Sequence, residues 1–190
     1  MPRGTLELVE AHGTALADAV DRGLEAAAPI EPSLRTAYGT VNLPFADGAA
    51  RETWRRQLAD IDDVYLQRHA ALMQAAIQRE GRLPAVQADP VQVWQLGSSG
   101  MTDGLTLVAL GGEVVVDYAL RLVREYPGRR MWVAGYSNDV FGYVPSLRVL
   151  REGGYEGGDA MIYYGRPAPF TEAVEGLIVG EVSRLMKQLG

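Results

Sequence analysis

One segment near the middle of the chain constrains the fold more than any other. Leu105–Leu110 is a short apolar run typical of a buried strand, and Gly111-Gly112 ends it. Apolar residues then recur at helical spacing over Glu113–Tyr126, and a second apolar run covers Met131–Gly135. A strand, a helix and a strand in this order form a β-α-β unit, in which a right-handed crossover joins two parallel strands. The sequence therefore predicts an α/β protein with a mixed sheet.

Flanking helices and one further hairpin are predicted around this unit. Periodic apolar residues predict helices over three segments: Thr5–Ala28, Ala49–Arg79 (as one or two helices) and Thr171–Gln188. Two more strands are predicted over Leu34–Leu43 and Val91–Leu96. The turn signal in Gly97–Gly104 predicts that the second of these forms a hairpin with the first strand of the β-α-β unit.

Length, charge and residue usage exclude several classes of protein. The 190 residues favour one domain over 1–190, with a core that hides roughly 70% of the surface of the unfolded chain. A net charge of −6 without a Lys/Arg-rich segment argues against nucleic acid as a partner. No apolar run approaches the ~20 residues of a membrane span, so no transmembrane segment is expected. The absence of cysteine excludes disulfides. No signal-type apolar stretch lies near residue 1, and the sequence does not indicate the compartment.

The carboxyl ends of the two predicted parallel strands indicate where a ligand would bind, because α/β sheets bind ligands there. Glu113 follows one strand end, and a loop with Asn138, Asp139 and Tyr143 follows the other. We therefore expect Glu113 to lie near this loop, although many residues separate them along the chain. Glu113 is also expected at a helix N-terminus, where the helix dipole favours a carboxylate. The alternative is that Glu113 only starts the helix.

Tyrosines gather in the segment that follows this loop. Two Gly-Gly pairs flank Tyr155-Glu156, which is a composition typical of a surface turn, and Tyr163-Tyr164 lie just beyond. The chain has nine tyrosines and only three phenylalanines. Phenylalanine would serve equally well for purely apolar packing, so the excess indicates phenols placed for hydrogen bonding.

Three of these segments resemble the neutral/alkaline non-lysosomal ceramidases, in their bacterial form. Leu107–Glu113 resembles the family segment that ends in a zinc-binding glutamate. Ala134–Val144 resembles the segment with a G-x-x-N core and a zinc-binding tyrosine five residues after the asparagine. Gly154–Gly157 resembles a Tyr-Glu element whose tyrosine helps to hold the reacting amide oxygen. The resemblance covers essentially the whole chain.

The resemblance implies a role for each of three residues. Glu113 and Tyr143 would each give an oxygen to Zn²⁺, and Tyr155 would donate a hydrogen bond to the oxyanion as the amide is attacked. Further candidates for lining the site are Asn138, Asp139 and Glu156. Zinc accepts oxygen ligands, and an open coordination position lets it polarise a carbonyl or activate water. The complete protein would hydrolyse an N-acyl amide lipid, with ceramide, which gives sphingosine and a fatty acid, as the family-typical substrate.

The zinc site implied by the resemblance is incomplete in this chain. The family also uses two zinc-binding histidines and a serine nucleophile, all upstream of the residues present here. His12 and His69 fall in predicted helices, do not resemble those segments, and are expected on a helix face or in the core. Two ligands fall short of the three protein ligands that are usual in a catalytic zinc site.

Three interpretations follow from this incomplete site. In the first, the chain is the C-terminal portion of a larger catalytic domain, which a missing N-terminal half or a homo-oligomer completes. In the second, it is a catalytically inactive, truncated module that serves in binding or assembly. The third is an unrelated Rossmann-like domain in which Gly111-Gly112-Glu113 occurs by chance.

Overall fold

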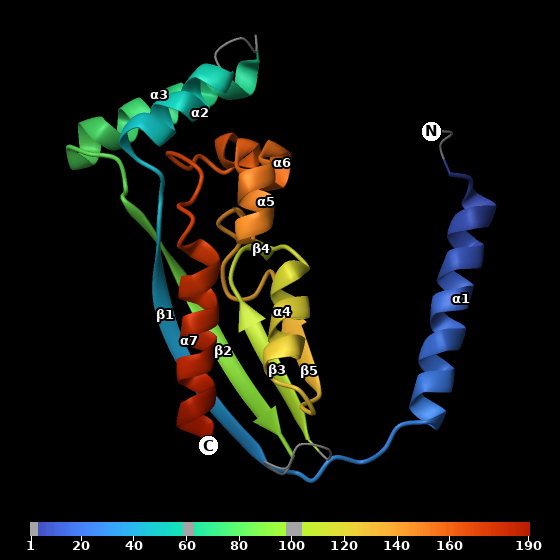
Figure 1. Cartoon of the computed structure of the whole chain (residues 1–190). Helices are drawn as coiled ribbons and strands as arrows, with labels where there is room; N and C mark the ends of the chain where they lie inside the picture. The colour runs from blue at the N-terminus through green and yellow to red at the C-terminus, as the bar shows by residue number, and fades with distance from the viewer. Residues whose placement is uncertain (1–3, 59–62, 98–103) are drawn as a thin grey trace. The chain divides into compact units, whose positions relative to one another are not determined.

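A four-stranded mixed sheet organises the residues that the computed structural model describes, which are 4–58, 63–97 and 104–190 (Figure 1). Its strand order is β1-β2-β3-β5, with the strands β1 (Leu34–Pro44), β2 (Val86–Leu96), β3 (Leu105–Leu110) and β5 (Met131–Ala134). The first two neighbouring pairs are antiparallel, and β3 pairs with β5 in parallel. Helix α4 (Asp117–Glu125) joins the two parallel strands. The predicted α/β class and β-α-β unit are confirmed.

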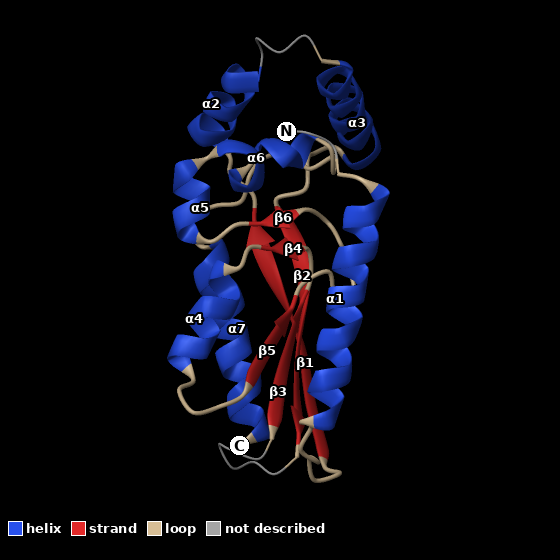
Figure 2. Ribbon diagram, turned by 90° about the vertical axis from the view of Figure 1, so that its right-hand side faces the viewer, coloured by secondary structure: helices blue, strands red, loops and turns tan. Residues whose placement is uncertain are grey.

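Two helices cover one face of the sheet. α7 (Val174–Leu189) packs on β1 and β2, while α4 packs on β5, and both lie on the same side of the strands (Figures 1 and 2). The buried apolar side chains on this face belong to one cluster that includes Leu43, Val91, Val93, Val108, Leu110, Ile178 and Leu185. On the opposite face of the strands, Trp94 and Trp132 are 38% and 61% exposed. The strands thus alternate between a core face and an open face.

The predicted helical region Ala49–Arg79 forms two helices, α2 (Gly48–Leu58) and α3 (Val64–Glu80). Asp63 caps α3 by accepting a hydrogen bond from the Tyr65 amide at 2.8 Å, and Gly81 ends it with a φ of 73°. Glycine is favoured at such a position because it adopts a left-handed conformation without a Cβ clash.

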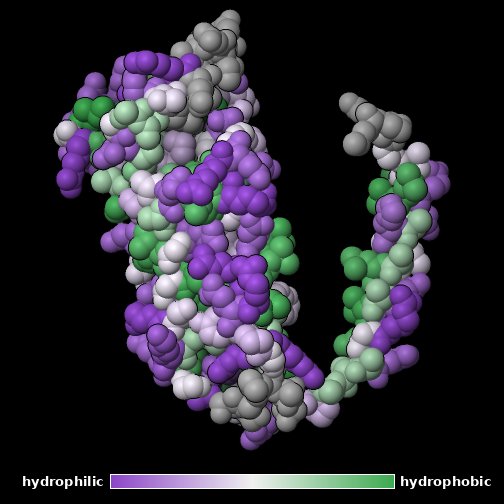
Figure 3. All heavy atoms as spheres, viewed as in Figure 1, coloured by the Kyte–Doolittle hydropathy of each residue, from purple (hydrophilic) through white to green (hydrophobic). Residues whose placement is uncertain are grey.

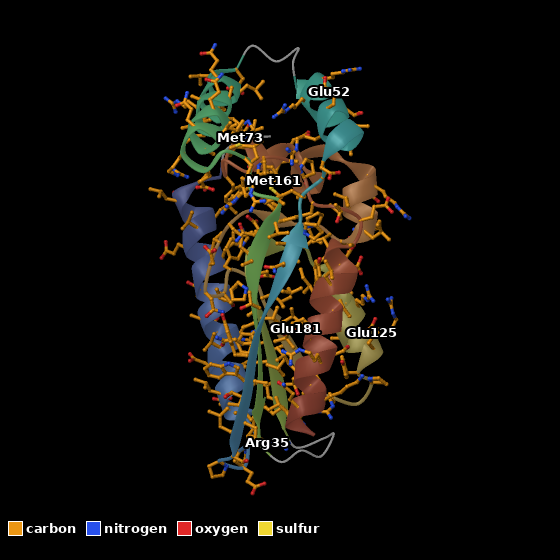
Figure 4. All side chains as sticks on the ribbon, turned by 90° about the vertical axis from the view of Figure 1, so that its left-hand side faces the viewer. Arg35, Glu52, Met73, Glu125, Met161 and Glu181 are labelled. Carbon is orange, nitrogen blue, oxygen red and sulfur yellow. The ribbon has the colours of Figure 1, made fainter. Side chains whose placement is uncertain are left out.

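Short helices gather near α3 at one end of the sheet. These are α5 (Leu147–Glu152), α6 (Gly154–Gly157) and the 3₁₀ helix η1 (Asp159–Ile162). α3 contacts η1, and the buried Met73 and Met161 mark this end of the molecule (Figure 4). The segment with the two Gly-Gly pairs has a composition typical of a surface turn. In the structure, part of this segment is helical.

The N-terminal residues form a separate unit, because the chain divides into Met1–Ile30 and Glu31–Gly190. The first unit contains α1 (Leu6–Glu25), whose cap Thr5 accepts a hydrogen bond from the Leu8 amide at 3.4 Å. None of the residues of α1 is buried, and hydrophobic side chains run along one side of it (Figure 3). The structure confirms the predicted helix and its amphipathic pattern.

The prediction of one helix over Glu113–Tyr126 is wrong at its start. Glu113–Val114 forms the short strand β4, which pairs in parallel with β6 (Tyr143–Val144), and α4 begins only at Asp117. The residues after Glu113 are valines, whose branched Cβ favours an extended backbone. Glu113 is therefore not at a helix N-terminus, and the helix dipole does not act on its carboxylate.

The antiparallel pairing of β2 with β3 confirms the predicted hairpin, and β2 begins five residues before the predicted strand, at Val86. Residues 98–103 of the predicted turn lie outside the described residues. No helix in the described part of the chain is both long enough and apolar enough to span a membrane.

Candidate functional site

The short parallel strands β4 and β6 bring together the two residues predicted to bind zinc. Glu113 pairs with Tyr143 in this ladder. The Glu113 amide donates a hydrogen bond to the Gly142 carbonyl at 2.8 Å, and the Val115 amide donates to the Val144 carbonyl at 3.2 Å. The expectation that Glu113 lies near the Asn138–Tyr143 loop is therefore confirmed.

A glycine turn holds Glu113 against this loop. The Gly112 amide donates to the Asp139 carbonyl at 2.7 Å, and the Gly112 carbonyl accepts from the Tyr136 amide at 2.8 Å. Gly112 has a φ of +65°, and a Cβ there would lie 2.6 Å from Cγ2 of Val144. Glycine is required at this position both for the turn and for the close approach of the two backbones.

The loop after β5 contains two residues with an unusual backbone conformation. Among the described residues, Tyr136 (φ 54°) and Asn138 (φ 69°) are the non-glycine residues with positive φ. Such residues cost about 1–3 kcal/mol each, and they concentrate at functional sites. The Gln92 side-chain amide donates to Oδ1 of Asn138 at 3.3 Å, which ties this loop to β2.

The Glu113 carboxylate acts on the phenols of Tyr136 and Tyr143. It raises the pKa of Tyr136 to about 12 and raises the pKa of Tyr143 well above its usual value, because a nearby carboxylate favours the protonated, hydrogen-bonding phenol. Both phenols are hydrogen-bond donors at neutral pH. A metal cation bound at Glu113 would invert this preference and favour the phenolate forms.

Five tyrosine rings form a contiguous cluster beside this carboxylate. The ring of Tyr143 makes edge-to-face contacts with Tyr155, at a centroid distance of 5.4 Å, and with Tyr164, at 6.4 Å. Tyr155 also contacts Tyr163 at 5.9 Å, and Tyr163 contacts Tyr65 of α3 at 5.0 Å. The side chain of Tyr155 is 49% exposed, so a bound molecule can reach its phenol. The rings position one another while their hydroxyls stay available.

The structure brings together some of the predicted site residues and not others. Glu113, Tyr143 and Tyr155 belong to one cluster. Asp139 is exposed and contributes its backbone carbonyl to the glycine turn. Glu156 is exposed on α6, and no hydrogen bond or ion pair joins it to the cluster within the described residues.

Two residues of this site, Tyr136 and Tyr164, were missing from the predicted set. Burial first, and then the charge of Glu113, raises the pKa of the Tyr164 phenol. The available signal was position: Tyr136 directly follows the strand end at Gly135, and Tyr164 belongs to the tyrosine-rich segment. The place of Tyr136 beside Gly112 depends on a left-handed turn that no local sequence pattern indicates.

The two histidines have the structural positions that were expected of them. Nε2 of the buried His69 on α3 lies 2.6 Å from the Arg166 carbonyl, so this side chain is a satisfied core histidine. His12 lies on α1, none of whose residues is buried.

The side chains around Glu113 carry oxygen atoms of a type that zinc accepts as ligands. Within residues 4–58, 63–97 and 104–190, no group of three or more His, Asp or Glu side chains could hold a metal ion. The donor set at Glu113 consists of one carboxylate and neighbouring phenols, and zinc accepts oxygen ligands of this type. A zinc site therefore stays a prediction that the chemistry of the side chains supports.

No family model, curated protein or solved structure matches this chain. The resemblance to the neutral ceramidases stays a prediction from the sequence.

Proposed function

We propose that this chain is part of a zinc-dependent amidohydrolase that resembles neutral ceramidase. The pairing of Glu113 with Tyr143 carries the proposal, because it puts a carboxylate beside a phenol from a distant segment of the chain. Both residues belong to the ceramidase-like segments. The contact between the rings of Tyr143 and Tyr155 supports it further, because the third such segment then faces the same site.

Each of these side chains has a distinct role in the proposed reaction. Glu113 and Tyr143 would hold Zn²⁺, which supplies a Lewis acid for polarising the amide carbonyl when it is bound. Tyr155 donates a hydrogen bond to the carbonyl oxygen of the substrate, where negative charge develops as the amide is attacked. Its half-exposed ring can reach a substrate, and its edge contact with Tyr143 limits its motion.

The substrate we propose is an N-acyl amide lipid, with ceramide cleaved to sphingosine and a fatty acid. Two histidine ligands and the serine nucleophile would come from polypeptide outside these 190 residues. In this proposal, the 190 residues supply Glu113 and Tyr143 as zinc ligands and Tyr155 as the hydrogen-bond donor to the oxyanion.

The proposal is tested by fusing the chain to the polypeptide encoded immediately upstream and measuring zinc-dependent release of fatty acid from ceramide. Tyr155→Phe should lower kcat by about 10²–10³, which is the usual loss on removing one oxyanion donor. Tyr38→Phe is a matched control, because Tyr38 lies on β1 with 61% of its surface exposed and outside the tyrosine cluster. A fused protein that binds stoichiometric zinc but cleaves no amide would refute the hydrolase function.

The tyrosine cluster favours one alternative, a non-catalytic binding module. The ring of Tyr143 contacts the rings of Tyr155 and Tyr164 edge to face, and the charge of Glu113 acts on Tyr164. Aromatic faces near a carboxylate bind quaternary ammonium groups through cation–π attraction. Titration with choline in the absence of metal distinguishes the two functions. Choline binding that Tyr155→Ala abolishes, with no hydrolysis by the fused protein, would favour the binding module.

A further inference from the structure

The face of the sheet opposite α4 and α7, here called the open face, carries no charged side chain. The four strands contain two charged residues, Arg35 and Asp89, and both occupy positions on the core face. The central row of the open face crosses all four strands through the paired residues Thr36, Trp94, Leu107 and Trp132. The neighbouring row consists of Leu34, Leu96 and Leu105. The open face is therefore apolar along most of its width.

Large apolar side chains of this face are accessible to solvent. Trp132 is 61% exposed, Leu34 is 58% exposed and Trp94 is 38% exposed. Soluble proteins rarely expose a contiguous apolar patch larger than a few hundred Å², and larger patches mark interaction sites. The helices α4 and α7 pack on the other side of the strands and do not shield these residues (Figure 2).

The polar side chains of the open face already have hydrogen-bond partners within the chain. Nε1 of Trp94 donates to Oε1 of Gln92 at 2.9 Å, and the side-chain amide of Gln92 donates to Asn138 at 3.3 Å. The hydroxyls of Tyr38 and Thr40 lie 3.3 Å apart. A partner that excludes water from this face thus leaves these groups paired, which lowers the cost of covering them.

We propose that the open face is the interface of a homodimer, in which a second copy of this chain packs its own open face against it. A face without charges brings no like charges together when it meets its own copy. About a two-fold axis parallel to the strands, β5 of each copy lies over β1 of the other. The bulky Trp132 then meets the small side chains of Thr36 and Thr40 on the second copy, and the same contact occurs twice.

The size of the face is sufficient for such a dimer. At about 3.3 Å per residue along a strand and about 4.8 Å between strands, the four strands span roughly 500 Å². Two such faces would bury on the order of 1,000 Å², which is the lower bound for a specific interface. An interface of this size should dissociate on dilution. This proposal does not depend on the amidohydrolase function.

The test is the molar mass of the full chain, measured by analytical ultracentrifugation over a series of concentrations. The mass should rise from 20.6 kDa towards twice this value, and tryptophan emission should shift to the blue as Trp94 and Trp132 become buried. Trp132→Glu should weaken dimerisation at least about tenfold, because it places an unpaired charge in an apolar interface. Leu120→Glu is the matched control, because Leu120 is 62% exposed on α4 and its substitution should leave dimerisation unchanged.

Three outcomes would overturn the proposal. A chain that stays at 20.6 kDa at all concentrations would refute the dimer, while the amidohydrolase proposal is still decided by the fused protein. If Leu16→Glu on α1 is a monomer and Trp132→Glu dimerises as the wild type does, the interface is α1 and not the open face. If Trp132→Glu loses its cooperative unfolding, Thr36→Glu replaces it, because Thr36 is exposed in the same row. Dimerisation of Thr36→Glu as tight as that of the wild type would also refute the open-face interface.

Discussion

At the scale of single residues, Asp89 on β2 is a carboxylate buried inside the fold. It is fully buried, and neither of its carboxylate oxygens has a hydrogen-bond partner among the described residues. Burial raises the pKa of Asp89 to about 7, and the charge of Asp139 adds to this shift. The nearby Gly111 amide opposes it, although this amide donates its hydrogen bond to the Pro90 carbonyl at 3.2 Å. A carboxylate without partners in the core destabilises the folded state in its charged form.

This pKa predicts how stability depends on pH. Between the ordinary value of 3.8 and about 7, the folded state keeps the proton that the unfolded state has lost. Stability should therefore fall as pH rises through this window, and the loss is complete above about 7. Asp89→Asn should remove this slope and raise the free energy of unfolding at alkaline pH by at most about 4 kcal/mol.

Urea unfolding at a series of pH values measures this effect. Asp47→Asn is the control, because Asp47 is exposed and its substitution should leave the pH slope of the wild type unchanged. An Asp89→Asn variant with the same pH slope as the wild type would show that another group causes it.

At the scale of elements, Ser146 joins the N-terminus of α5 to α4. Its hydroxyl donates to Oδ2 of Asp117 at 2.5 Å and accepts from the Val149 amide at 3.2 Å, so it caps α5 while it is buried. Arg148 also donates to Asp117, through Nε and Nη2 at 3.1 Å. One carboxylate on α4 thus orients the start of the helix that follows β6.

Ser146→Ala should lower the free energy of unfolding by about 1–2 kcal/mol, because it removes a helix cap and one buried hydrogen bond. A double-mutant cycle with Asp117→Ala separates the two contributions. The two substitutions should couple by at least about 0.5 kcal/mol, because their side chains share a hydrogen bond. If the losses in free energy of unfolding from the two substitutions simply add, the helix cap alone accounts for the effect of Ser146→Ala.

The elements that could be predicted are those with a long hydrophobic pattern of their own. The strands and the helix of the β-α-β unit, together with α1, follow from local periodicity and from turn residues. β4 could not be predicted, because two residues form a strand only when β6 lies beside them. The same limit applies to the candidate site. The proximity of Glu113 to the loop followed from topology, whereas the position of Tyr136 depends on a strained turn.

At the scale of the whole molecule, every described side chain of the hydrophobic core belongs to residues 31–190. The cluster of buried side chains begins at Leu43 on β1 and ends at Leu189 on α7. Residues 4–30, the described part of the unit Met1–Ile30, contribute none of them. A lone helix of this length is only marginally stable in water.

A chain that begins at residue 31 should therefore keep the fold of the larger unit. Its urea midpoint and near-ultraviolet circular dichroism should match those of the full chain, and its helical signal should fall only by the share of α1. A chain that lacks residues 174–190 is the contrasting truncation. It loses Ile178, Val182 and Leu185 from the core, so its cooperative unfolding should be abolished. If the chain from residue 31 loses its cooperative transition, the separate-unit interpretation of residues 1–30 is wrong, and the exposed apolar side of α1 supports the larger unit after all.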